Sequence, residues 1–192
     1  MRKFDPKHFE RLLNPERKKT QDPDVIFGAL GLSEGERLAD IGVGPGYFAL
    51  PAAEKVGPTG KVYALDIAAE MLEYVQQRAA TAGITNIEAV LSQEAEFPLP
   101  DASVDAVLIA NVLHETELPV VFLQDAWRIL AADGRVAIVE WRRDRPEVGP
   151  PLHERLAFEQ VEGYLQEAGF NTVEAFEVGP YHFGVRARRP AR

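Results

Sequence analysis

The sequence of 192 residues predicts an α/β fold: one mostly parallel sheet with helices on both faces and an antiparallel hairpin at its C-terminal end. Three observations lead to this prediction. Short segments rich in β-branched residues alternate with helical patterns, glycines stand at the segment ends, and only three residues join the last two strand-like segments. Strands that alternate with helices are connected by crossovers and therefore run parallel, whereas so short a connection forces an antiparallel pair.

Five parallel strands are expected, with amphipathic helices between them. Met71 and Val75 share one face of a helix that follows the second strand, and Pro119 fits the first turn of the helix after the fourth strand. The predicted strands are Arg37–Ile41, Lys61–Asp66, Ile87–Leu91, Val104–Ala110 and Arg135–Trp141.

The C-terminal part departs from this alternation. After a helical stretch, Phe158–Ala168, come the strand-like segments Thr172–Val178 and His182–Arg188. The turn Gly179–Tyr181 joins them, so they should pair antiparallel.

The chain is expected to form one globular unit with a small N-terminal addition. Residues 1–36 should form a helical cap, with helices around Pro6–Leu13 and Pro23–Leu30. Residues 37–192 should hold the whole sheet, because no linker, repeat or low-complexity segment interrupts them.

Composition excludes several kinds of chemistry. The chain has no cysteine, so disulfides, thiolate metal sites and a cysteine nucleophile are ruled out, and no metal site is expected. The N-terminus lacks the apolar core of a signal peptide. The most apolar stretch, Val104–Leu113, contains Asp105 and is too short to span a bilayer. These features indicate a cytoplasmic protein.

Charge is unevenly distributed along the chain. Acidic residues number 30 against 21 basic ones, for a formal net charge of −9, yet residues 1–20 and 186–192 are basic. An acidic body disfavours nucleic acid as a partner, because nucleic-acid binding needs a broad positive surface. The Arg-rich ends are expected to be solvated tails.

The sharpest motif is a glycine-rich turn that ends the first strand. It reads Asp40-Ile41-Gly42-Val43-Gly44-Pro45-Gly46, and its three alternating glycines allow a tight turn with backbone N–H groups near a ligand. This pattern favours a nucleotide-type cofactor at the carboxyl edge of the sheet over a plain strand-to-helix turn. Tyr47 stands where a dinucleotide-binding fold needs its third glycine, and Asp40 disfavours a pyrophosphate but suits a cationic ligand.

A second acidic residue, Asp66, ends the second strand. A carboxylate at this position can accept hydrogen bonds from both hydroxyls of a ribose, which favours a role in cofactor binding. The alternative is that Asp66 is the N-cap of the helix Ile67–Arg78, and the two roles are compatible.

With these motifs the sequence resembles the class I S-adenosylmethionine-dependent methyltransferases, of the small, single-domain type similar to quinone and sterol methyltransferases. The resemblance runs from about Glu36 to Arg188. Besides the glycine turn, it is carried by Ala64–Ile67 with Met71-Leu72, Phe97–Asp105 and Leu130–Arg135. Four shorter segments resemble a prokaryotic subgroup of that family: Pro15–Arg17, Val112–Glu115, Gly149–Arg155 and Gly179–His182.

The resemblance implies a Rossmann-like seven-stranded methyltransferase sheet. It also implies S-adenosyl-L-methionine as the cofactor, with S-adenosyl-L-homocysteine as the product. Gly42, Gly44 and Gly46 would lie along the methionine end of the cofactor. Asp40 would hold the amino group there, and Asn111 would contribute backbone contacts.

Toward the nucleoside, the resemblance assigns the ribose hydroxyls to Asp66 and the adenine surface to Ile67 and Met71. The family often has an aspartate after the third strand that accepts the adenine amine. Here Gln93 or Glu94 occupies that place, and either side-chain oxygen is a suitable acceptor. The alternative is that this stretch is a solvated acidic loop.

The acceptor side of the site is expected after the fourth and fifth strands. His114 is the candidate base, because its ordinary pKa lies near neutrality; the alternative is that it starts or caps the next helix. Trp141 lines the substrate site or packs under the following loop. His153 and Arg155 are candidates for binding an anionic substrate. The alternative is a surface ion pair with Glu154 or Glu159.

Two further residues, Tyr181 and His182, lie in the hairpin turn. From there they reach the same mouth of the site, so Tyr181 is a candidate for substrate contact. A turn would, however, expose such residues in any case.

Methyl transfer to a small organic molecule is therefore the expected function. In the family that the sequence resembles, Pro-Pro and an aromatic residue at this point mark members that act on the planar nitrogens of adenine or glutamine. Asn111 is followed by Val-Leu-His instead, so the resemblance disfavours those acceptors. The lack of cysteine disfavours a thiolate-bound arsenic substrate. The alternatives are a protein or RNA acceptor, a non-catalytic cofactor-binding subunit and a nicotinamide oxidoreductase. Oligomeric state is left open.

Overall fold

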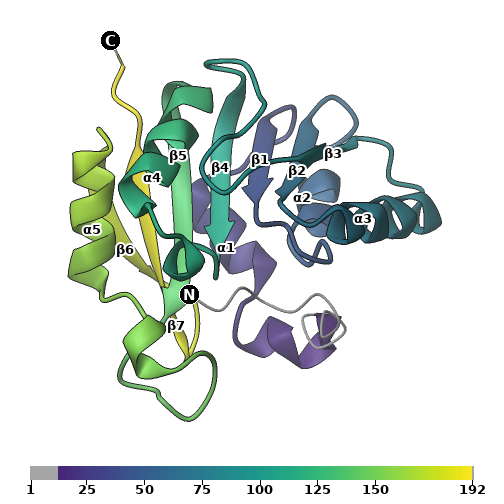
Figure 1. The fold of residues 1–192 in the computed structure, drawn as a ribbon. Coiled ribbons are helices and arrows are strands. Elements are labelled where there is room, and N and C mark those ends of the chain that lie inside the picture. Colours follow the sequence, from purple (N-terminus) through teal and green to yellow (C-terminus); the bar gives the residue numbers. More distant parts are fainter. Residues whose placement is uncertain (1–12, 192) are drawn as a thin grey trace.

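The computed structural model of the protein describes residues 13–191. Seven strands and five α-helices alternate along most of this part of the chain, with three short 3-10 helices (Figure 1). In chain order they are η2 (Pro15–Lys19), α1 (Pro23–Leu30), β1 (Arg37–Ile41), α2 (Ala49–Val56), β2 (Lys61–Asp66), α3 (Ala69–Ala82), β3 (Ile87–Leu91), β4 (Val104–Ala110), η3 (Leu113–Glu115), α4 (Pro119–Ile129), β5 (Leu130–Trp141), η4 (Leu152–Glu154), α5 (Phe158–Glu167), β6 (Asn171–Glu177) and β7 (His182–Arg188).

The strands form one sheet in the order β3-β2-β1-β4-β5-β7-β6. β1 to β5 run parallel, and β7 is antiparallel to both β5 and β6. This confirms the predicted seven-stranded, mostly parallel sheet with its C-terminal hairpin. Of the helices between residues 13 and 191, none is long and apolar enough to cross a membrane.

Most element bounds agree with the sequence prediction, and the departures have local causes. β5 begins at Leu130, five residues before the predicted start at Arg135, because Leu130 pairs with Val104 ahead of a register shift in the β4–β5 ladder. The predicted helix at Pro23–Leu30 is confirmed as α1. The helix expected around Pro6–Leu13 falls almost entirely outside the described residues.

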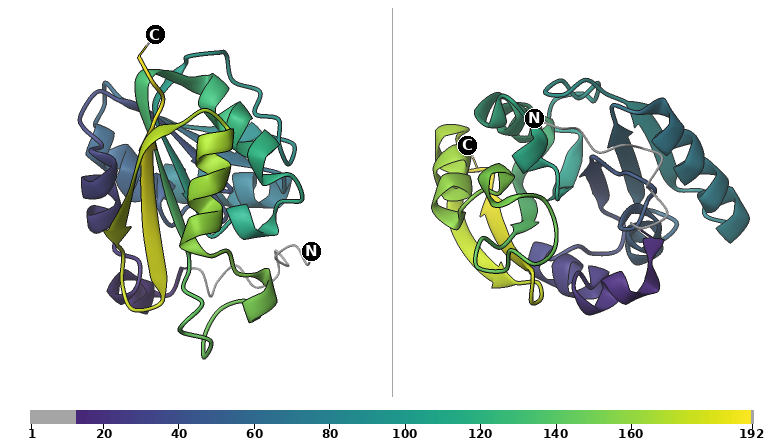
Figure 2. Two further views of the ribbon diagram at one scale, coloured as in Figure 1. Left: turned by 90° about the vertical axis from the view of Figure 1, so that its left-hand side faces the viewer. Right: turned by 60° about the horizontal axis from the view of Figure 1, so that its bottom comes forward.

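Helices cover both faces of the sheet and enclose two apolar cores (Figure 2). α1, α2 and α3 pack on one face, and α4 and α5 on the other. The apolar core on the α1 side includes Ile26, Phe27, Leu38, Val62 and Leu108. That on the α4 side includes Phe97, Val107, Leu123, Ile138 and Leu165.

The parallel register brings the carboxyl ends of the central strands to one edge. Ile41 of β1 is level with Leu65 of β2 and Ile109 of β4. At the same edge Trp141 of β5 pairs with His182 of β7. The arrows of β1 and β4 point to this edge, and Figure 2 shows it from below, where η2 and the loop that carries η4 lie over it. Ligands of open α/β sheets bind at this kind of edge.

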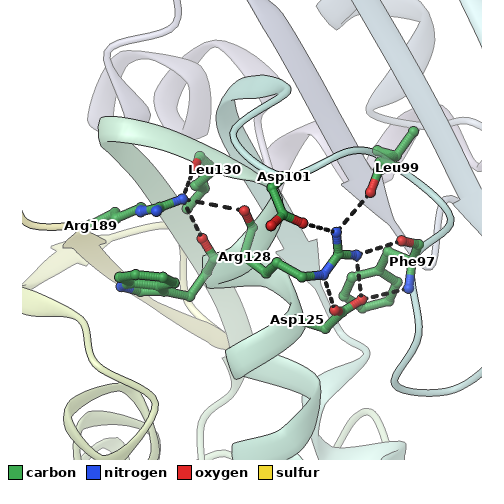
Figure 3. Close-up of polar contacts among 8 residues, drawn as sticks. Phe97, Leu99, Asp101, Asp125, Arg128, Leu130 and Arg189 are labelled. Carbon is green, nitrogen blue, oxygen red and sulfur yellow. Dashed lines mark hydrogen bonds and ion pairs between the residues drawn. The ribbon is translucent and has the colours of Figure 1, made fainter.

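A loop replaces a helix between β3 and β4, and Arg128 of α4 holds it in place (Figure 3). The Arg128 guanidinium donates to the carbonyls of Phe97 and Leu99 at 2.7 and 2.8 Å, and to Asp101 Oδ1 at 2.8 Å. Asp125 accepts from the same guanidinium at 2.6 Å and from the Phe97 backbone N–H at 2.6 Å. The loop is therefore ordered by α4, although it has no regular structure of its own.

Arg189, near the C-terminus, is not part of a solvated tail, which corrects the sequence prediction for this residue. Arg189 donates to the carbonyls of Trp127, Arg128 and Leu130 at the end of α4 and lies over the Trp127 ring at 3.8 Å (Figure 3). A guanidinium at this point satisfies carbonyls that a helix end leaves unpaired. The charged group of Arg189 therefore forms hydrogen bonds within the fold.

Arg128→Lys should lower the free energy of unfolding by about 2 kcal/mol, because an ammonium cannot reproduce the fork of hydrogen bonds. Urea denaturation followed by far-UV circular dichroism measures the change. Arg186→Lys is the matched control, since Arg186 pairs with Glu174 where both side chains are about half exposed. That control should change stability by less than about 0.5 kcal/mol. Equal effects of the two substitutions would contradict the role of Arg128.

Candidate cofactor and acceptor site

The glycine turn after β1 is fixed by its neighbours and by its own backbone. The N–H groups of Gly42 and Val43 both donate to the Leu65 carbonyl of β2 at 2.9 Å. Gly42, Gly44 and Gly46 all have positive φ angles, which favour glycine. A Cβ on Gly42 would also collide with the Val112 side chain. The turn therefore needs glycine for both its conformation and its packing.

Asp66 connects the end of β2 to this turn. Its Oδ2 accepts from the Gly44 N–H and its Oδ1 from the Ala68 N–H, both at 2.9 Å. Burial raises the pKa of Asp66, and these backbone donors oppose the rise. α3 begins at Ala69 with Ala68 as its N-cap residue, so the alternative that Asp66 is the N-cap is wrong. Each carboxylate oxygen keeps a second acceptor position, which suits the ribose hydroxyls.

Asp40 lies buried beneath the turn, with 2% of its surface exposed. Its Oδ2 has no hydrogen-bond partner. Burial raises the pKa of Asp40 to about 7, the charge of Arg17 opposes this rise, and the charge of Asp66 adds to it. A buried carboxylate oxygen without a donor is costly unless a ligand supplies one. An ammonium group next to the turn would do so, and Asp40 therefore fits the amino group of the implied cofactor.

Arg17 is a residue of this site that sequence reasoning missed. η2 places its guanidinium 4.2 Å from the centre of the Tyr47 ring and 5.1 Å from that of Phe48. Its Nε donates to Gln21 Oε1 at 2.8 Å, and burial lowers its pKa to about 10. The basic N-terminal region was expected to be a solvated tail, so for Arg17 that prediction is wrong. The only signal was its place in the Pro15–Arg17 motif.

Gln21 ties the same segment to the end of β4. Its amide N–H donates to Asn111 Oδ1 at 3.1 Å, and the Asn111 amide donates back to Gln21 Oε1 at 3.2 Å. The Tyr47 hydroxyl donates to the Gln21 carbonyl at 2.9 Å. Asn111 has a positive φ of 60°, which asparagine tolerates better than most residues. The segment from η2 to α1 is thus bonded across the carboxyl edge.

The residues predicted to contact the adenine lie beside Asp66. Ile67 is 47% exposed, whereas Met71, on the first turn of α3, is buried. Gln93 forms a single bridge with Glu96, and Glu94 Oε1 accepts from the Glu117 N–H at 2.8 Å. Their roles toward the cofactor stay predictions.

His114 and Glu140 form a buried pair at the same edge. His114 Nδ1 lies 2.8 Å from Glu140 Oε2, and the His114 backbone N–H donates to Glu140 Oε1 at 3.1 Å. Glu140 is fully buried. Burial alone would lower the pKa of His114, but the hydrogen bond and charge of Glu140, with smaller effects of two further glutamates, raise it above its ordinary value.

This pair resolves one alternative for His114. The residue belongs to η3, and α4 begins separately at Pro119, so His114 neither starts nor caps α4. With Nδ1–H donating to Glu140, Nε2 is the nitrogen that can accept a proton. The sequence places Glu140 next to Trp141 at the end of the fifth predicted strand and gives no sign of its bond to His114.

Arg155 does not fit the predicted role in binding an anionic substrate. It is buried, and its guanidinium donates to the carbonyls of Pro150 at 2.8 Å, Arg142 at 2.6 Å and Arg145 at 2.8 Å, and also to that of Val148. All four acceptors belong to the loop between β5 and α5. Arg155 therefore organises this loop.

The other acceptor-side candidates are placed more peripherally. Trp141 packs against Gly149, whose hypothetical Cβ would overlap the indole, and lies 4.1 Å from His182 between ring centroids. His153 is 80% exposed and lies 3.7 Å from Glu154, as in the ion-pair alternative. Tyr181 is partly buried in the hairpin turn. Roles of these residues toward a substrate stay predictions.

His182 differs from the expectation of an exposed turn residue. It is 2% exposed, and neither ring nitrogen has a hydrogen-bond partner. Burial lowers its pKa to about 3, with further lowering from the charges of Arg17 and Arg155. The ring is buried because β7 already begins at this residue and the Thr20 region packs against the turn.

Asp40→Asn should change how stability depends on pH in the ligand-free protein. The pKa of Asp40 lies near 7 in the folded state against 3.8 ordinarily. The folded protein thus keeps a proton that the unfolded chain loses. Stability from this group is full below pH 4 and falls as the pH rises to 7, by at most about 4 kcal/mol. The amide that replaces the carboxyl group cannot ionise, so the variant should gain stability over the wild type between pH 5 and pH 8.

Urea denaturation of the variant and the wild type at pH 5 and at pH 8 measures that difference in stability. Other titrating groups are the same in both proteins, so their effects cancel in the comparison. A constant difference between variant and wild type across this range would contradict the raised pKa of Asp40.

Comparison with known proteins identifies the family of this fold. A family model described as a methyltransferase domain matches residues 39–138, a little over half of the chain. The crystal structure of a SAM-dependent methyltransferase from Aquifex aeolicus is 35% identical, covers 97% of this chain and 100% of its own, and superposes with a TM-score of 0.93.

Two curated relatives extend the comparison. A demethylmenaquinone methyltransferase from Geobacillus kaustophilus is 27% identical over 84% of this chain and 81% of its own length. An arsenite methyltransferase from Halobacterium salinarum is 28% identical over 74% of this chain. The chain spans only 39% of that relative's length. On the family model and the Aquifex structure together, the chain belongs to the class I S-adenosylmethionine-dependent methyltransferases.

Proposed function

We propose that this protein transfers a methyl group from S-adenosylmethionine to a small organic acceptor, with His114 as the base. The observation that carries the proposal is the buried pair of His114 and Glu140 at the carboxyl edge, next to the glycine turn. The cofactor supplies an electrophilic methyl group on a sulfonium. The chain's own residues bind the two reactants, align them and receive a proton.

The cofactor side is assigned to the residues around the two acidic positions. Asp40 accepts from the amino group, with Gly42, Gly44 and Gly46 along the methionine end. Asp66 accepts from the ribose hydroxyls. The remaining assignments, argued from their positions beside Asp66 and after β4, are Ile67 and Met71 at the adenine, Gln93 or Glu94 at its amine, and Asn111 near the methionine end.

His114 is suited to take a proton from the acceptor. Glu140 holds the Nδ1 side, which leaves Nε2 to accept. The charge of Glu140 also stabilises the imidazolium that forms. A base is useful only for an acceptor that must lose a proton. The pair of His114 and Glu140 therefore favours an acceptor with an ionisable group.

A small molecule is favoured as the acceptor. One relative is named for demethylmenaquinone and another for arsenite. The acidic body of this chain disfavours RNA, and the lack of cysteine disfavours arsenite held by thiolates. The absence of cysteine also fits a cytoplasmic location.

An assay with cofactor carrying a labelled methyl group tests the function. Fractionated small metabolites, proteins and RNA from a bacterial extract are offered in parallel. Label should appear in the small-molecule fraction. Label in protein or RNA alone would overturn the proposed acceptor class. If no fraction is labelled although S-adenosylhomocysteine binds tightly, the protein would be a non-catalytic subunit.

His114→Ala should lower kcat by about a hundredfold or more while the affinity for S-adenosylhomocysteine stays unchanged. In the wild type, the rate should rise with pH and reach a plateau above the raised pKa of His114, because only neutral imidazole accepts a proton. Glu140→Gln removes the charge that raises this pKa, so the rising limb should move to lower pH. The pH–rate profile measures both effects, and His153→Ala is the matched control at an exposed histidine. An unshifted limb in Glu140→Gln would argue against His114 as the base.

Asp66→Ala should weaken S-adenosylhomocysteine binding at least tenfold, about 1.4 kcal/mol, because the ribose hydroxyls lose their acceptor. Isothermal titration calorimetry measures the affinity. Asp66→Asn keeps one side-chain acceptor oxygen and should show a smaller loss. Unchanged affinity in a folded Asp66→Ala variant would remove Asp66 from the site.

A further inference from the structure

His182 is a buried polar side chain that the proposed reaction does not yet use. It begins β7 opposite Trp141, at the carboxyl edge of the sheet. Its ring lies against the indole, with 4.1 Å between centroids and 45° between planes. Both ring nitrogens are buried without a hydrogen-bond partner. The Thr20 carbonyl lies close enough to favour the protonated ring, but it does not reach hydrogen-bond geometry.

Packing alone does not account for a histidine at this position. A buried polar group without a partner costs free energy, commonly about 1–3 kcal/mol. A phenylalanine would make the same ring contact with Trp141 at no such cost. The imidazole of His182 lacks hydrogen-bond partners at the carboxyl edge, where a ligand is expected to bind. This indicates that a bound ligand supplies the missing hydrogen bond.

The charges around the ring define the chemistry of that ligand. The charged side chains with the largest effects on His182 are those of Arg17, Arg155 and, when protonated, His114, and all three are positive. Glu140 is nearby on β5, but its carboxylate is bonded to His114. Neutral amine acceptors, which gain positive charge on methylation, are disfavoured by this environment. An oxygen that becomes negative is favoured.

We propose that neutral His182 binds an acidic hydroxyl of the methyl acceptor, of the phenol or enol class, and orients it toward His114. This inference rests on the proposed function and names the substrate class of that site. The hydroxyl O–H bond breaks and its proton forms the new N–H bond at Nε2 of His114. The electron pair stays on the acceptor oxygen, which then accepts a hydrogen bond from the N–H of His182.

Two substitutions separate this role from packing. His182→Phe keeps the ring contact but has no donor, so it should raise the denaturation midpoint and lose acceptor binding. His182→Asn keeps an N–H donor in a smaller side chain and should retain part of that binding. A purely structural role predicts the first effect on stability without any effect on binding.

The probes are 4-nitrophenol and its isostere 4-nitroaniline, titrated into the full chain saturated with S-adenosylhomocysteine. The nitrophenol should bind the wild type in its ionised form, visible as nitrophenolate absorbance below the pH at which free probe ionises. The nitroaniline should bind at least tenfold more weakly, and His182→Phe should weaken nitrophenol binding at least tenfold, about 1.4 kcal/mol. The affinity for S-adenosylhomocysteine should be the same in all variants.

Equal binding of the two probes, or equal nitrophenol affinity in the wild type and His182→Phe, would overturn the inference. So would a wild-type complex that binds no nitrophenol. Failure of the wild type to bind S-adenosylhomocysteine would instead contradict the proposed function itself, so the two failures are distinguishable.

Discussion

The hydrogen bonds between the ends of β1 and β2 are the interaction on which the site depends. The Leu65 carbonyl accepts from the N–H groups of Gly42 and Val43, and the Asp66 carboxylate accepts from that of Gly44. Together these bonds fix the glycine turn against the neighbouring strand. Because the turn is held in this way, Asp40 stays beneath it with one oxygen unpaired. Parallel pairing alone would bring the strand ends together, but it would not produce this conformation.

The two sides of the carboxyl edge differ in how their buried charges are balanced. On the cofactor side, Asp40 has an unpaired oxygen, and the charge of Arg17 lowers its pKa. On the acceptor side, Glu140 is bonded to both the backbone and the ring of His114. A carboxylate left short of donors attracts a cation, whereas one that is fully bonded orients and charges its partner. In the proposed reaction, the same residue type therefore serves binding on one side and proton transfer on the other.

Local sequence signals were enough for the fold and for locating the two acidic residues of the candidate cofactor site. Strand periodicity gave β1 to β4, and glycine spacing located Asp40 and Asp66, because each of those features depends on neighbouring residues only. The contacts of Arg17, Gln21, Glu140 and His182 join distant parts of the chain, and Gln21 and Asn111 are 90 residues apart. No spacing rule reports such pairs. Arg155 was misassigned because an arginine among prolines looks like a surface residue until its carbonyl partners are known.

Unpaired polar atoms are concentrated where a ligand is expected. Within residues 13–191, five buried side-chain atoms lack a hydrogen-bond partner, and three of them belong to Asp40 and His182. If such atoms were mere imperfections of packing, they would have no reason to share the carboxyl edge. Their free-energy cost falls instead on an acid short of a donor and an imidazole in a positive environment, the two residues that we propose contact the cofactor and the acceptor. On that proposal the cost is recovered only when both reactants are bound, so it favours the complex in which they meet.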